Sequence, residues 1–247
     1  MGKVALAIPA EKPEDLASSE RTYLRLRERV AALKPPCFWP TRPAQPPLNA
    51  AERAGLFRLV EAIPGPCGEV EMVAFMQAMR HAPAGDVVEV GAGWGRSASL
   101  LVWLAGRYRI GAVLCVDAWS DPPGGAEAAP EPDSSLRIFE MNLAPLAQGR
   151  LNYIRAAPAE AAARYRPGLT VATDAFGATT YEGAIAFLHI AGEGGLDAEP
   201  WTSKVAPGGW IVFEDGLRPQ ADAFAEAAGD TIGARFQAGG ALFFQLR

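Results

Sequence analysis

A glycine-rich segment in the middle of the chain is the strongest candidate for chemistry. An apolar run that includes Glu89 leads into Gly91, Gly93 and Gly95, which alternate with other residues, and a helical pattern begins near Arg96. Glycines allow a sharp turn and let a ligand approach where a Cβ would block it, and the next helix adds free N–H groups. The pattern predicts a cofactor-binding loop at the carboxyl end of a strand, the alternative being a tight turn without a ligand.

Asp117 is the second candidate, at the end of the next apolar run, AVLCVDAW. A carboxylate at this place accepts hydrogen bonds from ribose hydroxyls, which several cofactors carry. Gly93, Gly95 and Ala98 also satisfy the dinucleotide spacing G-x-G-x-x-G/A, so the loop alone does not separate nicotinamide cofactors from others. The alternative for Asp117 is a turn or helix-cap residue.

Polar residues near the ends of two later apolar runs are candidates for proton transfer. His189 lies near the end of AIAFLHIA, at the edge of the sheet where parallel α/β folds place their chemistry. A histidine inside a buried strand is more often a core residue, and that alternative stays open. The full set of catalytic candidates is His189, Glu193, Glu214 and Asp215.

Strands that alternate with helices must position these residues. After Pro83, short apolar runs alternate with helical patterns, which predicts βαβ units and a mainly parallel sheet. The last segment, ARFQAGGALFFQLR, predicts two strands around the turn-prone pair Gly239-Gly240. We therefore expect an α/β fold with an antiparallel hairpin at its carboxyl-terminal edge.

The first part of the chain is unusually rich in proline: residues 1–66 contain 10 of the 21 prolines of the whole chain. Helical patterns over residues 14–34, 50–63 and 68–81 are separated by segments too rich in proline for regular structure. We expect a helical, proline-rich extension over residues 1–83 and a cofactor-binding domain over residues 84–247. Phe38 and Trp39 are the expected anchors of an extended arm. This arm could pack against a second subunit, which would make a homo-oligomer, or fold back on its own core.

The composition excludes several classes of protein. With a net charge of −5 and a pI near 5.2, the chain lacks the basic balance of a nucleic-acid binder. No apolar run approaches the ~20 residues that span a bilayer, and the first residues make a poor signal peptide. The scattered Cys37, Cys67 and Cys115 fit a reduced, cytoplasmic protein. We expect a small-molecule partner, no nucleic acid and no membrane.

The motifs together resemble the class I S-adenosylmethionine-dependent methyltransferases. The resemblance covers about residues 84–247 and rests on the glycine loop, Asp117, the segment PGGWIVFED and the terminal hairpin. Within the class, LHI followed by a glycine-containing loop, and then FED, resembles a bacterial subgroup of O-methyltransferases that act on sugars and secondary metabolites.

The resemblance implies a Rossmann-like three-layer sandwich with a seven-stranded sheet and S-adenosylmethionine as the cofactor. The glycine loop would hold the methionine part and Asp117 the ribose, while Trp119 would pack on the adenine or, alternatively, in the core. The implied cofactor-binding residues are Glu89, Gly91, Gly93, Gly95, Arg96, Ser97, Asp117 and Trp119.

The chain departs from this subgroup at its metal and base positions. Ala191 stands where the subgroup has a metal-binding aspartate, and Gly194 stands in place of a histidine. Glu214 and Asp215 remain as candidate ligands of a divalent metal, with Glu193 as a third, although hard cations usually take more oxygen ligands.

Three functions follow from these observations. The first is S-adenosylmethionine-dependent O-methylation of a small hydroxylated acceptor, such as a sugar or polysaccharide precursor. The second is a methyltransferase-fold binding protein that has lost catalysis, for which Ala191 and Gly194 argue. The third is a nicotinamide-dependent oxidoreductase, which rests only on the spacing of Gly93, Gly95 and Ala98.

Overall fold

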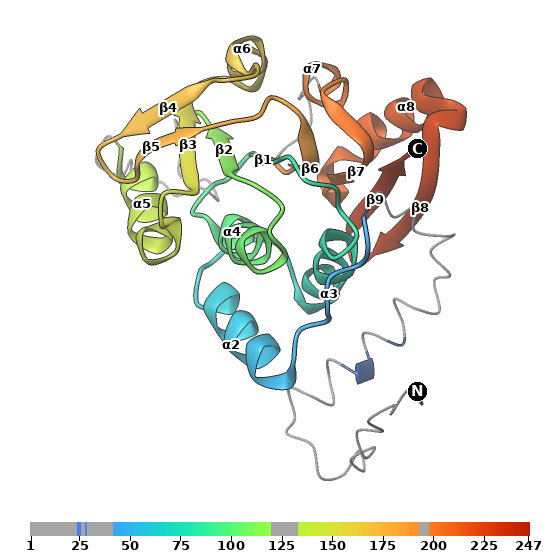
Figure 1. The fold of residues 1–247 in the computed structure, drawn as a ribbon, viewed down its shortest axis with the longest axis horizontal. Helices are drawn as coiled ribbons and strands as arrows, with labels where there is room; N and C mark the ends of the chain where they lie inside the picture. The colour runs from blue at the N-terminus through green and yellow to red at the C-terminus, as the bar shows by residue number, and fades with distance from the viewer. Residues whose placement is uncertain (1–23, 26–27, 29–41, 120–132, 193–197) are drawn as a thin grey trace, which may run out of the picture.

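The computed structural model describes residues 24–25, 28, 42–119, 133–192 and 198–247 (Figure 1). Several sequence predictions lie outside these residues: nearly all of the helix over 14–34, Cys37, the anchors Phe38 and Trp39, and the candidate Glu193.

A seven-stranded sheet forms the centre of the fold, with the strand order β3-β2-β1-β6-β7-β9-β8. The strands from β3 to β7 run parallel, and β9 is antiparallel to both β7 and β8. This arrangement confirms the predicted mainly parallel seven-stranded sheet with a terminal antiparallel hairpin. The strands are β1 (Asp86–Val90), β2 (Val113–Asp117), β3 (Leu151–Arg155), β6 (Ile185–Ile190), β7 (Val205–Phe213), β8 (Ile232–Ala238) and β9 (Ala241–Leu246).

Helices cover both faces of the sheet, which confirms the three-layer sandwich (Figure 1). One face packs against α3 (Glu69–Met79), α4 (Arg96–Tyr108) and α5 (Ser134–Ala147), with α2 (Ala50–Glu61) outside α4. The other face packs against α6 (Pro158–Arg164), α7 (Glu199–Thr202) and α8 (Arg218–Ala228), and two short 3-10 turns are η2 (Asp215–Leu217) and η3 (Gly229–Thr231). None of the described helices is long and apolar enough to cross a membrane.

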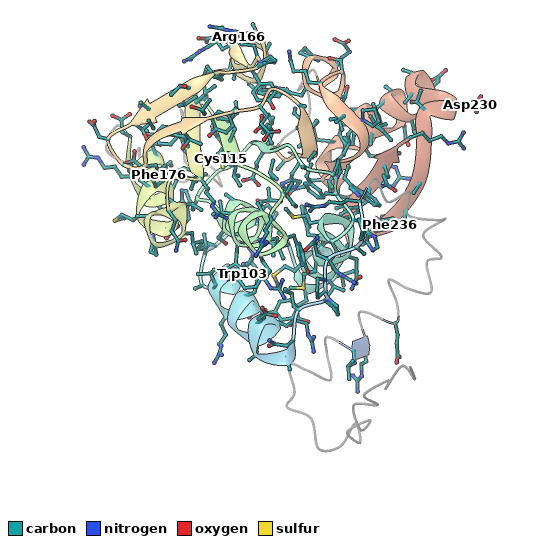
Figure 2. All side chains as sticks on the ribbon, in the orientation of Figure 1. Trp103, Cys115, Arg166, Phe176, Asp230 and Phe236 are labelled. Atoms are coloured by element: carbon teal, nitrogen blue, oxygen red, sulfur yellow. The ribbon has the colours of Figure 1, made fainter. Side chains whose placement is uncertain are left out.

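The central strands are mostly apolar on both sides because both of their faces are covered, with Asp86, Glu89 and His189 as buried polar exceptions. Every residue of β1 and of β6 is buried. Val87 belongs to the cluster on the α4 face and Val88 to the cluster on the α8 face. Side chains fill the space between the sheet and both helical layers, with Cys115 near the centre of the molecule (Figure 2). The strand order reverses between β1 and β6, and open α/β sheets bind ligands at the carboxyl ends of such neighbouring strands.

Asn49, whose residue type commonly caps helices, precedes helix α2 as its N-cap. Asn49 accepts a hydrogen bond from the Glu52 N–H, and the Glu52 carboxylate accepts one from the Asn49 N–H, which completes a capping box. The helices α2 and α3 share one core with the sheet. The division of the chain at residue 84 stays a prediction.

A two-stranded antiparallel hairpin, β4 (Thr170–Thr173) and β5 (Gly177–Thr180), was not predicted from the sequence. Its residues are mostly threonine, alanine and glycine, so they show no apolar alternation. Buried Asn152 of β3 holds the hairpin, because its side-chain amide donates to the carbonyls of Val171 and Gly177.

Candidate active site

The glycine loop, residues 91–95, joins β1 to α4 at the carboxyl edge of the sheet. Its three glycines have φ values of +88°, +49° and +91°, which L side chains rarely adopt. A Cβ at Gly91 would lie 2.2 Å from the Ala191 carbonyl oxygen, and one at Gly95 would lie 2.2 Å from Leu143 Cδ2. A Cβ at Gly93 would meet nothing within 4 Å. Two of the glycines therefore allow close packing, and Gly93 alone of the three faces open space.

The end of β2 holds the Gly93 residue from both sides. The Gly93 N–H donates to Asp117 Oδ2 at 2.9 Å, and the indole N–H of Trp119 donates to the Gly93 carbonyl oxygen at 2.7 Å. The Trp119 backbone N–H donates to Asp117 Oδ1 at 2.8 Å. The structure thus brings together three predicted cofactor residues, Gly93, Asp117 and Trp119.

Helix α5 supports the same loop from the other side. The Asn142 side-chain amide donates to the Trp94 carbonyl oxygen at 2.8 Å. Phe139 packs against Trp119 with ring centroids 4.9 Å apart, and Tyr153 lies 5.3 Å from Trp119. The glycine loop is therefore held by hydrogen bonds and aromatic packing from segments that follow it in the sequence.

Arg96 turns away from the open side of the glycine loop. Its guanidinium donates to the carbonyl oxygens of Cys67 and Ile63, each at 3.0 Å, and so holds the segment 63–67. Ser97, the other predicted residue of this turn, is buried. Direct cofactor contacts by Arg96 and Ser97 stay predictions.

A buried histidine between two glutamates forms the second part of the site. Glu89 of β1 and His189 of β6 are register partners, and His189 Nδ1 lies 2.9 Å from Glu89 Oε1. On its other side, His189 Nε2 lies 3.5 Å from Glu214 Oε1, directly after β7. His189 is 1% exposed and the Glu214 side chain 18% exposed, so only Glu214 reaches toward solvent.

The two glutamates on either side of His189 raise its pKa and so favour its protonated form. Burial by itself lowers the pKa of His189, but the neighbouring carboxylates of Glu214 and Glu89 outweigh it and raise the pKa to about 9. His189 is therefore a cation near neutral pH, where it donates protons rather than accepting them. Of the predicted catalytic residues, Glu214 is better suited than His189 to accept a proton.

A cavity of about 230 Å³, the histidine pocket, opens beside Glu214. Its polar wall includes His189, Glu214 and Asp215, three of the predicted catalytic residues. The segment before α3 and α3 itself supply residues that were not predicted, and the turn between β8 and β9 closes the far side. The complete lining is Pro66, Cys67, Glu71, Phe75, His189, Glu214, Asp215, Gly216, Gly240 and Ala241.

Two of the unpredicted wall residues, Glu71 and Cys67, have properties that could not be predicted from the sequence. Glu71 Oε1 accepts a hydrogen bond from the Gly240 N–H at 2.6 Å, so α3 is tied to the terminal hairpin. Cys67 has a φ of +83°, which is rare for a residue with a Cβ. Burial and the charge of Glu214 raise the pKa of the Cys67 thiol, so the thiol stays protonated. A helical pattern was visible over 68–81, but nothing in it marked these side chains as part of a site.

The predicted metal ligands do not form a metal centre in the part of the chain that the structure describes. Among those residues, no group of three or more histidine, cysteine, aspartate or glutamate side chains is arranged to hold a metal ion. Ala191, which stands where the subgroup has a metal-binding aspartate, directly follows β6 and has no oxygen in its side chain, and the expected third ligand Glu193 lies outside the described residues.

No protein-family model matches the sequence, and no curated protein matches it. A candidate caffeoyl-CoA O-methyltransferase from Staphylococcus aureus is 11% identical and superposes with a TM-score of 0.50 over 81% of this chain and 93% of that chain. Cofactor-bound Rv0187 from MTB is 14% identical, with a TM-score of 0.50 over 78% and 88% of the two chains. This chain has the Rossmann-like methyltransferase fold.

A further solved structure, precorrin-6y C5,15-methyltransferase from Geobacter metallireducens GS-15, is 14% identical, with a TM-score of 0.47 over 75% of this chain and 92% of that chain. At sequence identities this low, structural similarity shows a shared fold but not a shared function. The predicted subgroup of sugar and secondary-metabolite O-methyltransferases stays a prediction, as do the roles of the individual residues.

Proposed function

We propose that this protein is an S-adenosylmethionine-dependent methyltransferase that methylates a hydroxyl group of a small acceptor, such as a sugar or polysaccharide precursor. The observation that carries the proposal is Gly93, which faces open space at the carboxyl end of β1 while Asp117 and Trp119 hold its backbone. The shared methyltransferase fold supports it.

The residues around the glycine loop fit the proposed cofactor. The Asp117 oxygens each accept one backbone N–H, and a carboxylate oxygen has a further lone pair for a ribose hydroxyl. Helix α4 starts directly after the loop, and its N-cap Gly95 makes no side-chain cap. The free N–H groups of its first turn suit the carboxylate of the methionine part.

The acceptor would enter the histidine pocket, whose residue Glu214 lies at the same edge of the sheet as the loop. The Ala191 N–H donates to the Val90 carbonyl, and the Glu214 N–H donates to the Ile190 carbonyl, so the ends of β1, β6 and β7 lie side by side. A group bound at the open side of Gly93 and a group bound beside Glu214 would therefore share one edge of the sheet. Holding two reactants in this way is a large part of what an enzyme contributes to a transfer reaction.

The proposed reaction needs one proton acceptor from the chain. Bound S-adenosylmethionine supplies the methyl group: a carbon–oxygen bond forms as the carbon–sulfur bond breaks, and a neutral thioether leaves. The hydroxyl proton passes to Glu214, whose carboxylate lies at the pocket wall. His189, held by Glu89 on its far side, positions the Glu214 carboxylate.

Titration calorimetry with S-adenosylhomocysteine, the demethylated cofactor, tests the first step. We expect the wild-type chain to bind it and the Gly93→Ala variant to bind at least about tenfold more weakly, because the added methyl group enters the open space. Gly149→Ala is the matched control. Its φ is +72°, a Cβ there also meets nothing within 4 Å, and it lies in the turn between α5 and β3.

Three outcomes would count against the proposal. No binding to the folded wild-type chain at about 1 mM cofactor, a range in which even weak sites fill, contradicts it. Selective binding of NAD would instead support the oxidoreductase. Binding without transfer of labelled methyl groups to metabolite and polysaccharide extracts would support the binding protein that has lost catalysis.

A further inference from the structure

Three hydrogen bonds close a ring between the glycine loop and the end of β2. Asp117 accepts the N–H groups of Gly93 and Trp119 on its two oxygens, at 2.9 and 2.8 Å. The Trp119 indole N–H completes the ring on the Gly93 carbonyl oxygen, at 2.7 Å. Both polar backbone groups of Gly93, the loop residue that faces open space, are thus fixed by β2.

The indole ring of Trp119 is already committed to the core. Trp119 is 5% exposed and belongs to the core cluster on the α4 face. Its neighbours are Phe139 of α5 and Tyr153 of β3, and both of these rings also pack against Phe176 (labelled in Figure 2). Little of the ring surface is left for an adenine to cover.

The backbone of Trp119 provides an independent observation. Its φ is +44°, in the left-handed region, which is unfavourable for a residue with a bulky side chain. Such conformations persist where the surrounding structure holds them, and they are concentrated at functional sites. Here the left-handed turn directs the backbone N–H to Asp117 and the indole N–H to Gly93, so one strained residue makes two bonds of the ring.

We propose that Trp119 is a positioning residue, whose indole N–H holds the Gly93 peptide in the orientation that S-adenosylmethionine binds, and that it is not a platform for the adenine. The inference rests on the proposed function. Its physical basis is pre-organisation: a loop that is already held in its bound geometry loses less conformational freedom when a ligand binds. Residue 119 therefore acts on the cofactor through Gly93.

The two roles of Trp119 respond differently to removal of the N–H. Trp119→Phe keeps an aromatic ring and loses the donor. Replacement of Trp119 by benzothienylalanine keeps the indole shape and exchanges the N–H for sulfur. We expect S-adenosylhomocysteine to bind both proteins about five- to tenfold more weakly than the wild type, as for loss of one buried hydrogen bond. Trp103→Phe, a half-buried tryptophan of α4 away from the loop, is the matched control and should leave the affinity unchanged.

The affinities are measured by calorimetry at a temperature where near-ultraviolet circular dichroism shows each protein to be folded. Hydrogen exchange of the Gly93 amide is the second readout, and we expect it to become faster in both Trp119 proteins and to stay unchanged in Trp103→Phe. Wild-type affinity of the benzothienylalanine protein would overturn the inference, because shape alone would then suffice. Wild-type affinity of Trp119→Phe would also overturn it. If the wild type itself does not bind, the proposed function fails instead.

Discussion

The glycine loop and the histidine pocket lie at one edge of the same sheet, but different forces hold them. In the glycine loop, neutral backbone groups are fixed by hydrogen bonds, and only Asp117 carries a charge within the ring. In the histidine pocket, a buried histidine lies between Glu89 and Glu214, and Asp215 and Glu71 add further carboxylates. The geometry of the glycine loop depends on backbone conformation and backbone hydrogen bonds. The geometry of the histidine pocket depends on the attraction between His189 and the two glutamates on either side of it.

The difference shows how the two halves of a transfer site can be built. A loop whose backbone is held in one conformation suits a constant ligand such as a cofactor, because the backbone groups that contact the ligand do not depend on side-chain identity. A cluster of charged side chains, by contrast, can change its chemistry when a single side chain is replaced. If this contrast is right, substitutions in the two regions should have different effects on stability and activity.

Gly91→Ala should cause the largest loss of stability, because the new Cβ would lie 2.2 Å from the Ala191 carbonyl oxygen at a φ of +88°. Overpacking and the left-handed backbone together predict a loss of about 4 kcal/mol in the free energy of unfolding, measured by urea titration. The Gly149→Ala control carries only the backbone cost, about 1 kcal/mol. Equal losses in the two variants would contradict the claim that close backbone packing holds the loop.

Glu214→Gln should affect the other region through activity rather than stability. Loss of the proton acceptor predicts a fall of about 100-fold in methyl transfer, which corresponds to about 2.7 kcal/mol in the activation free energy. Transfer is followed with labelled cofactor, and the dissociation constant of S-adenosylhomocysteine should change less than twofold. A variant that transfers methyl groups at the wild-type rate would show that Glu214 is not the base.

Glu89→Gln should lower the stability of the protein, because Glu89 contacts His189 on the side away from Glu214. The amide keeps the shape and the hydrogen bond to His189 but removes a buried charge, so we expect a loss of about 2 kcal/mol in the free energy of unfolding. Exposed Glu226→Gln is the control, with a change within about 0.5 kcal/mol. A loss in the control as large as in Glu89→Gln would remove the distinction between buried and surface charge.

A pH titration of stability should show the smallest effect. Because the pKa of His189 is raised to about 9 in the folded chain, its protonation stabilises the fold fully below pH 6.5, and this contribution is lost as the pH rises toward 9. We expect urea titrations to show a loss of roughly 1 kcal/mol between pH 6.5 and pH 8.

The same titration has an internal control. Burial and Arg80 lower the pKa of His81, so that histidine contributes a slope of the opposite sign, which fades as the pH rises above the unfolded pKa of about 6.5. Glu89→Gln removes one of the charges that raise the pKa of His189, so its slope should be reduced. An unchanged slope in Glu89→Gln would assign the pH dependence to other groups.

Several features of this protein could be predicted because they depend only on short stretches of chain. The alternating glycines, Asp117 at the end of a strand and the capping residue Asn49 could all be identified because backbone conformation and local periodicity leave a mark in neighbouring residues. The parallel sheet and the terminal hairpin could be predicted for the same reason. The β4–β5 hairpin could not, since its small and polar residues carry no alternation.

The contacts between side chains from different elements could not be predicted and are seen only in the folded chain. The sequence does not show that Glu89 and His189 are register partners, that Arg96 holds the segment 63–67, or that Glu71 and Phe75 line the pocket of Glu214. It also left open whether Trp119 faces a ligand or the core, which the packing of α5 and β3 decides. The physical reason is that these contacts join segments far apart in the chain, where burial and packing, rather than local propensity, determine the partners.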